Sequence, residues 1–126
     1  MDSQAELTVP ADTSYVAMVR SATVAIAANA DFTVDAMEDL RLAVDEACAL
    51  IIADATPDSQ MTIAWRASGN HLAIEVSGPS SSGAPVARDT FAWTVLSALV
   101  DEVEATVEAD RQTIVLRAHG VESVRL

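Results

Sequence analysis

The sequence of 126 residues contains no lysine, one cysteine, few aromatic residues and no long apolar run. The lone cysteine, Cys48, cannot form an internal disulfide and supplies no metal cluster. The longest stretch without a polar residue near the middle of the chain, residues 47–53, is far too short to cross a bilayer. No basic segment precedes an apolar stretch at the N-terminus, so no secretory signal is expected. We therefore expect one soluble, cytoplasmic domain over residues 1–126, with 51% hydrophobic residues to build its core.

Positive charge is scarce as well, because seven arginines face 19 carboxylates and the formal net charge is −12. Nucleic acids and anionic membranes attract basic surfaces, so neither is expected as a partner. A basic protein is the partner that this charge favours, since opposite charges accelerate encounter. Acidity that only keeps a domain in solution accounts for the same composition equally well.

The spacing of apolar residues predicts an alternation of strands and helices. Strands are expected at 5–9, 61–67, 71–76, 103–107 and 113–118, and helices from a cap at Asp12 or Thr13 to about residue 29, from a cap at Asp35, and over 91–100. Residues 1–4 and 119–126 are expected to be tails, and 78–85 (GPSSSGAP) a mobile loop. This order predicts an α+β fold, a two-layer sandwich with helices on one face of a mixed, mainly antiparallel sheet.

Each of the first two predicted helices carries an apolar stripe at helical spacing. The stripe of the first helix contains Tyr15, Met18, Val19, Ala22, Ile26 and Asn29. The stripe of the second contains Met37, Leu40, Val44, Ala47 or Cys48, and Ile51. We expect both stripes to face the core, with Arg20 lying off the first stripe and reaching solvent, and Glu46 almost opposite Met37 on the second helix.

Residues 39–48, DLRLAVDEAC, resemble the first nucleotide-box helix of the anti-sigma serine kinases (RsbW type) in the GHKL, or histidine kinase-like ATPase, superfamily. The strand that ends at Pro10 and the helix that carries Arg20 agree with the same family and follow its order. Residues 91–103 (FAWTVLSALVDEV) resemble the corresponding helix and strand start of actinobacterial sigma-F anti-sigma factors. The resemblance spans about residues 5–118. It implies a GHKL-like anti-sigma domain and a homodimer.

Active members of that family keep a sigma factor from RNA polymerase, and they use ATP and magnesium to phosphorylate an anti-anti-sigma protein of the STAS type. The resemblance gives Glu46 the place of the catalytic base and Gly78 the place of one glycine beside the nucleotide. The asparagine that would hold magnesium is replaced by Leu50. The aspartate that would bind the adenine amine falls at Val76, or at Ser77 with a one-residue shift.

These substitutions remove the chemistry that ATP requires. Magnesium prefers hard oxygen ligands, so Leu50 cannot bind it; it either fills the former pocket or packs between helices. Ser80 replaces a second glycine, and the bulky Phe91 and Trp93, which we expect in the core, stand where a glycine-rich segment would lie. We therefore expect no ATP or magnesium cofactor, with Glu46 a vestigial base and Gly78 a degenerate nucleotide contact.

Partner binding is the other role that the resemblance assigns. Arg20 occupies the place of a helix arginine that family members use toward sigma and STAS proteins, and Asp45 and Glu46 are further candidates. Each of the three is equally well described as a solvated surface residue. His71 and His119 fall in predicted strands without companion ligands, so no metal site is expected.

The function expected from the resemblance is an anti-sigma factor. It would sequester a sigma factor of the sigma-F or sigma-B type and be countered by a STAS protein. An active ATP-dependent serine kinase acting on the STAS protein is the alternative. A GHKL-derived module that serves a partner other than sigma is a third interpretation.

Overall fold

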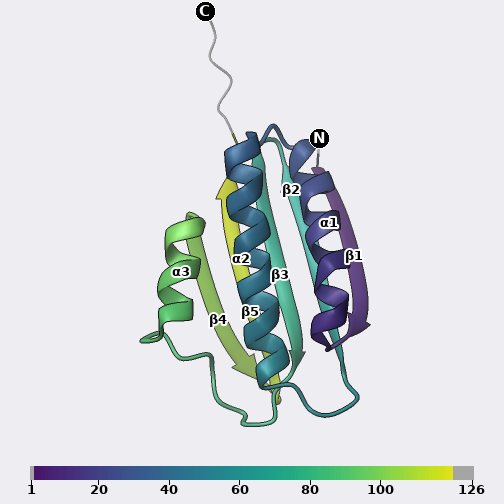
Figure 1. Ribbon diagram of the computed structural model, residues 1–126, viewed down its shortest axis with the longest axis vertical. Coiled ribbons are helices and arrows are strands. Elements are labelled where there is room, and N and C mark those ends of the chain that lie inside the picture. The colour runs from purple at the N-terminus through teal and green to yellow at the C-terminus, as the bar shows by residue number, and fades with distance from the viewer. Residues whose placement is uncertain (1, 121–126) are drawn as a thin grey trace, which may run out of the picture.

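Residues 2–120 are described by the computed structural model, and they form three helices on a five-stranded sheet (Figure 1). The elements follow the chain as β1 (Asp2–Pro10), the 3-10 helix η1 (Thr13–Tyr15), α1 (Val16–Ala28), α2 (Val34–Ala53), β2 (Gln60–Ser68), β3 (His71–Pro79), α3 (Phe91–Leu99), β4 (Glu102–Glu108) and β5 (Arg111–His119). All three helices lie on one face of the sheet, with α2 between α1 and α3. No helix within residues 2–120 is both long enough and apolar enough to span a membrane.

The strand order is β1-β2-β3-β5-β4, and every neighbouring pair is antiparallel. This confirms the α+β two-layer prediction, although the described strands include no parallel pair and the sheet is not mixed.

The predicted N-terminal tail is wrong for residues 2–4, because β1 pairs with β2 as far as Asp2, whose carboxylate accepts a hydrogen bond from Ser68 at 2.8 Å. The predicted C-terminal tail begins too early, since His119 belongs to β5; residues 121–126 lie outside the described residues.

Helix α2 contributes the centre of the core, as its stripe predicts. Its fully buried residues are Leu40, Ala43, Val44, Ala47, Cys48 and Ile51. Ala43 lies outside the predicted stripe and is buried because α2 is flanked by a helix on each side. Burial raises the pKa of the Cys48 thiol to about 12, so this cysteine is an inert apolar group. Burying one Leu or Ile side chain contributes about 1.5–3 kcal/mol, so this helix stabilises the fold strongly.

Helix α1 faces the sheet through a different stripe from the predicted one. Its buried residues are Val16, Val19, Thr23 and Ala27. Tyr15 and Met18 remain 37% and 52% exposed, so the expectation that they belong to the core is wrong. The apolar pattern misses Thr23 because it is polar. Its hydroxyl nevertheless donates to the Val19 carbonyl at 2.8 Å and accepts from the buried Trp65 Nε1 at 3.0 Å.

Helix α2 begins two residues earlier than predicted. Thr33, not Asp35, is its N-cap, and the Thr33 hydroxyl accepts from the Ala36 amide at 3.0 Å. Asp35 lies in the first turn instead, where a negative charge favours the helix dipole. Glu38 lies beyond the first turn and pairs with Arg41, whose guanidinium lowers the pKa of the Glu38 carboxyl.

The contact between Thr23 and Trp65 gives a first prediction. Thr23→Val keeps the side-chain shape but leaves the indole N–H buried without its acceptor, so the free energy of unfolding should fall by about 1–3 kcal/mol. Denaturant unfolding measures this change. The matched control is Thr106→Val on the exposed face of β4, which should stay within about 0.5 kcal/mol of the wild-type chain. Equal stabilities of the two variants would mean that the Thr23 hydroxyl does not support the core.

Candidate functional site

The position that the resemblance assigns to a nucleotide lies where the C-terminal end of α2 meets β3. Gly78 is buried there, and a Cβ atom on it would lie 3.1 Å from Cγ2 of Ile51. The amide of the buried Gln112 donates to the Ile51 carbonyl at 2.9 Å, one of the carbonyls that the end of a helix leaves unpaired, and to the Pro79 carbonyl at 3.3 Å. Gly78 therefore serves the close packing of α2 on the sheet.

The loop after β3 is tied to the end of α2 by Asp54. The Asp54 carboxylate accepts from the hydroxyls of Ser80 at 2.5 Å and Ser82 at 2.8 Å, and from the Ser82 amide at 3.1 Å. We call these hydrogen bonds from Ser80 and Ser82 the Asp54 latch, and they lower the pKa of the Asp54 carboxyl. The stabilisation by the latch is therefore complete above the ordinary carboxyl pKa and is lost as the pH falls through the lowered pKa of Asp54. The predicted loop is confirmed from residue 80, whereas Gly78 and Pro79 belong to β3. Its mobility stays a prediction.

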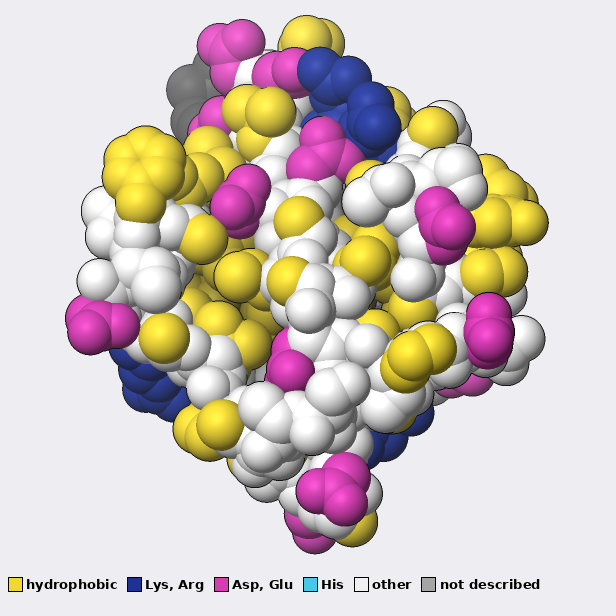
Figure 2. All heavy atoms as spheres, turned by 60° about the horizontal axis from the view of Figure 1, so that its bottom comes forward, with side chains coloured by type: hydrophobic (Ala, Val, Ile, Leu, Met, Phe, Trp, Pro, Cys, Tyr) yellow, Lys and Arg dark blue, Asp and Glu magenta, His cyan; other side chains and the backbone are white. Residues whose placement is uncertain are grey.

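A small cavity remains between this loop, α2 and the start of α3. Its volume is about 210 Å³, below the range of roughly 300–1,000 Å³ that is typical of ligand pockets. The lining residues are Leu50, Asp54, Ser82, Ala84, Pro85, Val86, Ala87, Thr90 and Gln112. Figure 2 views the molecule from the end that carries the loop, and hydrophobic side chains line the hollows between its ridges. Leu50 thus presents an apolar wall where a magnesium ligand would be needed.

The other residues expected around a nucleotide are dispersed. Glu46 is half-buried one helical turn before Leu50, and no hydrogen bond or ion pair from the described part of the chain reaches its carboxylate. Val76 is in the core, and Ser77 accepts from Arg111 at 2.8 Å. Glu75 lies on the opposite face of the sheet from Val76, as predicted, where it pairs with Arg66. Glu46 thus supplies a carboxylate, but position 50 supplies no magnesium ligand and positions 76 and 77 supply no acidic group for adenine.

The aromatic residues at the start of α3 behave differently from each other. Trp93 packs against the core, with the Arg88 guanidinium 5.3 Å from its ring centre. Phe91 is 83% exposed, so its predicted place in the core is wrong. Phe91 is the first residue of a helix of nine residues that buries only Leu96 fully, and its ring points away from the core.

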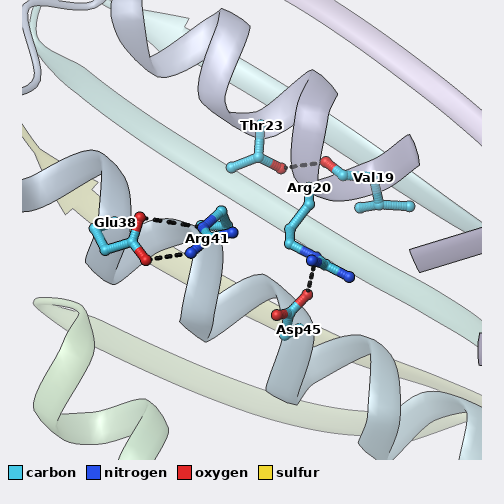
Figure 3. Close-up of polar contacts among 6 residues, drawn as sticks. All are labelled: Val19, Arg20, Thr23, Glu38, Arg41 and Asp45. Atoms are coloured by element: carbon cyan, nitrogen blue, oxygen red, sulfur yellow. Dashed lines mark hydrogen bonds and ion pairs between the residues drawn. The ribbon is translucent and has the colours of Figure 1, made fainter. Parts of the chain in front are cut away.

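Arg20 and Asp45 form an ion pair between α1 and α2. Figure 3 shows the contact, in which Nε of Arg20 lies 2.7 Å from Oδ1 of Asp45. The side chains are about one-third exposed, while the two contacting atoms are shielded from solvent. Arg20 thus reaches solvent with about a third of its side chain, as expected, but it also bridges two helices, which the sequence did not indicate. Glu46 follows Asp45 on α2 and points about 100° away, so the structure brings together only two of the three candidate partner-binding residues.

A groove of about 420 Å³ lies beside this ion pair, between α1 and α2. Its lining is Ala17, Arg20, Ser21, Val24, Ala25 and Arg41. Small residues at 17, 21 and 25 recur every four positions on α1, and this spacing is the sequence signal that could have located the groove. Apart from Arg20 and Arg41, the residues that line the groove are small or apolar. The groove can therefore hold a protein segment and pair with its acidic side chains.

Comparisons with known proteins agree with this fold. The family model described as "Histidine kinase-like ATPase domain" matches residues 9–118. The anti-sigma-F factor RsbW of Mycobacterium tuberculosis, in strains CDC 1551/Oshkosh and ATCC 25618/H37Rv, is 36% identical over 99 residues, which are 79% of this chain and 59% of each relative. The chain thus spans less than two-thirds of the length of these relatives.

A solved structure shows the same fold at low identity. The crystal structure of the RsbU and RsbW domains of a Mycobacterium tuberculosis protein superposes with a TM-score of 0.73 and 16% identity, over 98% of this chain and 35% of that one. This likeness supports the fold, and the family match over residues 9–118 shows that the chain belongs to the histidine kinase-like ATPase domain family.

Proposed function

We propose that this protein is an anti-sigma factor. It sequesters an alternative sigma factor of the sigma-F or sigma-B type from RNA polymerase, and a STAS anti-anti-sigma protein counters it. The observation that carries this proposal is the 36% identity to the anti-sigma-F factor RsbW over 99 residues. A homodimer that acts in the cytoplasm is part of the proposal.

The groove between α1 and α2 is the proposed partner surface. It combines apolar area with two guanidinium groups, and a buried apolar centre with charges around it is the usual arrangement of a protein interface. Arg20 is held by Asp45 at 2.7 Å, so its guanidinium is oriented before a partner arrives. A positioned group loses less side-chain entropy on binding. Glu46 is a further proposed contact, because no described residue forms a hydrogen bond or an ion pair with its carboxylate.

Sequestration without nucleotide is the proposed mode of action. Three features support it: Leu50 in the magnesium position, the contact between Gly78 and Ile51, and the Asp54 latch over the remaining cavity. An active serine kinase is the alternative function. It would require the loop to leave Asp54 and a magnesium ligand that residue 50 does not provide.

Thermal unfolding with ATP and magnesium tests this closed site. We expect 1 mM ATP–Mg to leave the melting temperature unchanged, because Leu50 offers no ligand to the metal and the Asp54 carboxylate that lines the cavity already accepts hydrogen bonds from Ser80 and Ser82. A site with a Kd of 10 µM would instead stabilise the protein by about 2.7 kcal/mol, which raises the melting temperature by several degrees. A rise of that size would restore the kinase interpretation.

Reversing the charge of Arg20 tests the proposed partner surface. Arg20→Glu should weaken binding to a sigma-F-type sigma factor or to its STAS protein at least tenfold, about 1.4 kcal/mol, because it places a carboxylate where the partner meets a guanidinium. The free energy of unfolding should fall by no more than about 1 kcal/mol, since the pair with Asp45 is partly exposed. Calorimetric titration and denaturant unfolding measure the two effects.

Two control variants separate partner binding from stability. Arg66→Glu reverses an arginine that also pairs with a carboxylate, Glu75 at 3.3 Å, but on the other face of the sheet, and it should leave affinity unchanged. The double variant Arg20→Glu with Asp45→Arg restores an ion pair between α1 and α2, so it should recover stability but not affinity. Unchanged affinity for both partners after Arg20→Glu would show that the groove is not the binding surface.

A further inference from the structure

The only two histidines of the chain are brought together at one end of the sheet, although they are far apart in the sequence. His71 on β3 is the register partner of His119 on β5. Their ring centres lie 6.1 Å apart, with the ring planes inclined by 46°. The prediction that the two residues lack companion ligands did not anticipate this strand pairing, which places the two rings side by side, or Asp101, which lies beside His119.

Asp101, just before β4, orients the His119 ring. Its Oδ2 atom lies 2.6 Å from Nδ1 of His119 and also accepts from the His119 main-chain N–H at 3.1 Å. An ionised carboxylate can only accept, so the ring proton resides on Nδ1 and the lone pair of Nε2 points away from Asp101. A carboxylate on one imidazole nitrogen is the arrangement that orients and strengthens histidine ligands of zinc.

The two imidazoles open into a shared surface cavity of about 390 Å³. Its lining is His71, Asp101, Glu102, Arg117, Ala118 and His119. The lining contains one guanidinium, of Arg117, and two carboxylates, of Asp101 and Glu102. The Arg117 guanidinium forms ion pairs with Glu102 at 3.7 Å and with Glu104 at 3.2 Å. The cavity therefore favours a cation. The side chains of His119 and Asp101 are about half exposed, so an ion has access from solvent.

The separation of the rings suits a shared metal ion. Zinc–nitrogen bonds of about 2.0–2.1 Å place the centres of two coordinating imidazoles roughly 5–6 Å apart. The observed 6.1 Å lies close to that range, and a small rotation of the exposed His71 ring would bring it within range. Imidazole nitrogen suits zinc, nickel and copper, whereas magnesium prefers oxygen.

We propose that His71 and His119 form an open binding site for a borderline divalent ion such as Zn²⁺, with Asp101 as the outer carboxylate that fixes His119. No third His, Cys, Asp or Glu within residues 2–120 is placed to complete a ligand set, so the described residues supply two imidazole ligands and leave the other positions of the ion open. The site lies away from the groove between α1 and α2 and does not depend on the proposed function.

Calorimetric titration of the untagged chain with ZnCl₂ tests this site. We expect one Zn²⁺ per chain, and at least a tenfold loss of affinity in His71→Ala and in His119→Ala. Asp101→Asn keeps both imidazoles and should lose less, but still several-fold, because outer-shell partners typically contribute 10–100-fold to metal affinity. In NMR spectra, Zn²⁺ should shift the imidazole nitrogens of both histidines first.

Two controls address non-specific binding of cations to an acidic protein. MgCl₂ should produce no saturable heat, and Glu108→Gln, which removes an exposed carboxylate of β4 outside the cavity, should bind Zn²⁺ like the wild-type chain. Melting temperatures without metal show that each variant is folded. Full Zn²⁺ affinity in both histidine variants, or a loss in Glu108→Gln equal to theirs, would overturn the proposal.

Discussion

The close contact of α2 with the sheet at Ile51 and Gly78 is the constraint on which the rest of this structure depends. A Cβ atom at position 78 would lie 3.1 Å from Cγ2 of Ile51, a tight contact that the glycine avoids. Gln112 of β5 donates a hydrogen bond to the Ile51 carbonyl. Asp54, at the end of α2, accepts hydrogen bonds from Ser80 and Ser82 of the loop after β3. Packing and hydrogen bonds together leave a cavity of about 210 Å³ at the position that the resemblance assigns to a nucleotide.

The proposed mode of action, sequestration without nucleotide, depends on the surface of the helices. Helix α2 serves both regions: its C-terminal end closes the cavity, and its middle supplies Asp45, which holds Arg20 of α1 beside the groove. A rigid α2 thus fixes the orientation of the guanidinium that the proposal assigns to partner binding. The net charge of −12 would add long-range attraction to a basic partner, while the two arginines at the groove would provide local pairing with acidic groups.

Much of the fold could be predicted because its signals are local. The stripe of α2 repeats every three or four residues, and the strands alternate, so both follow from hydrophobicity alone. Tertiary contacts explain the errors. The hydroxyl of Thr23 can be buried because it accepts a hydrogen bond from Trp65, which is far away in the sequence. Asp54 likewise accepts from serines of a loop that follows two further strands. His71 and His119 meet only through the register of β3 and β5, which no local pattern specifies.

Binding of a sigma-F-type sigma factor in the complete absence of nucleotide is the most direct test of the central claim. A calorimetric titration would be performed without nucleotide and repeated with 1 mM ATP–Mg. The closed packing of α2 predicts binding in both titrations with the same Kd, weakening as the salt concentration rises. Binding that appears only when ATP–Mg is present would contradict the account.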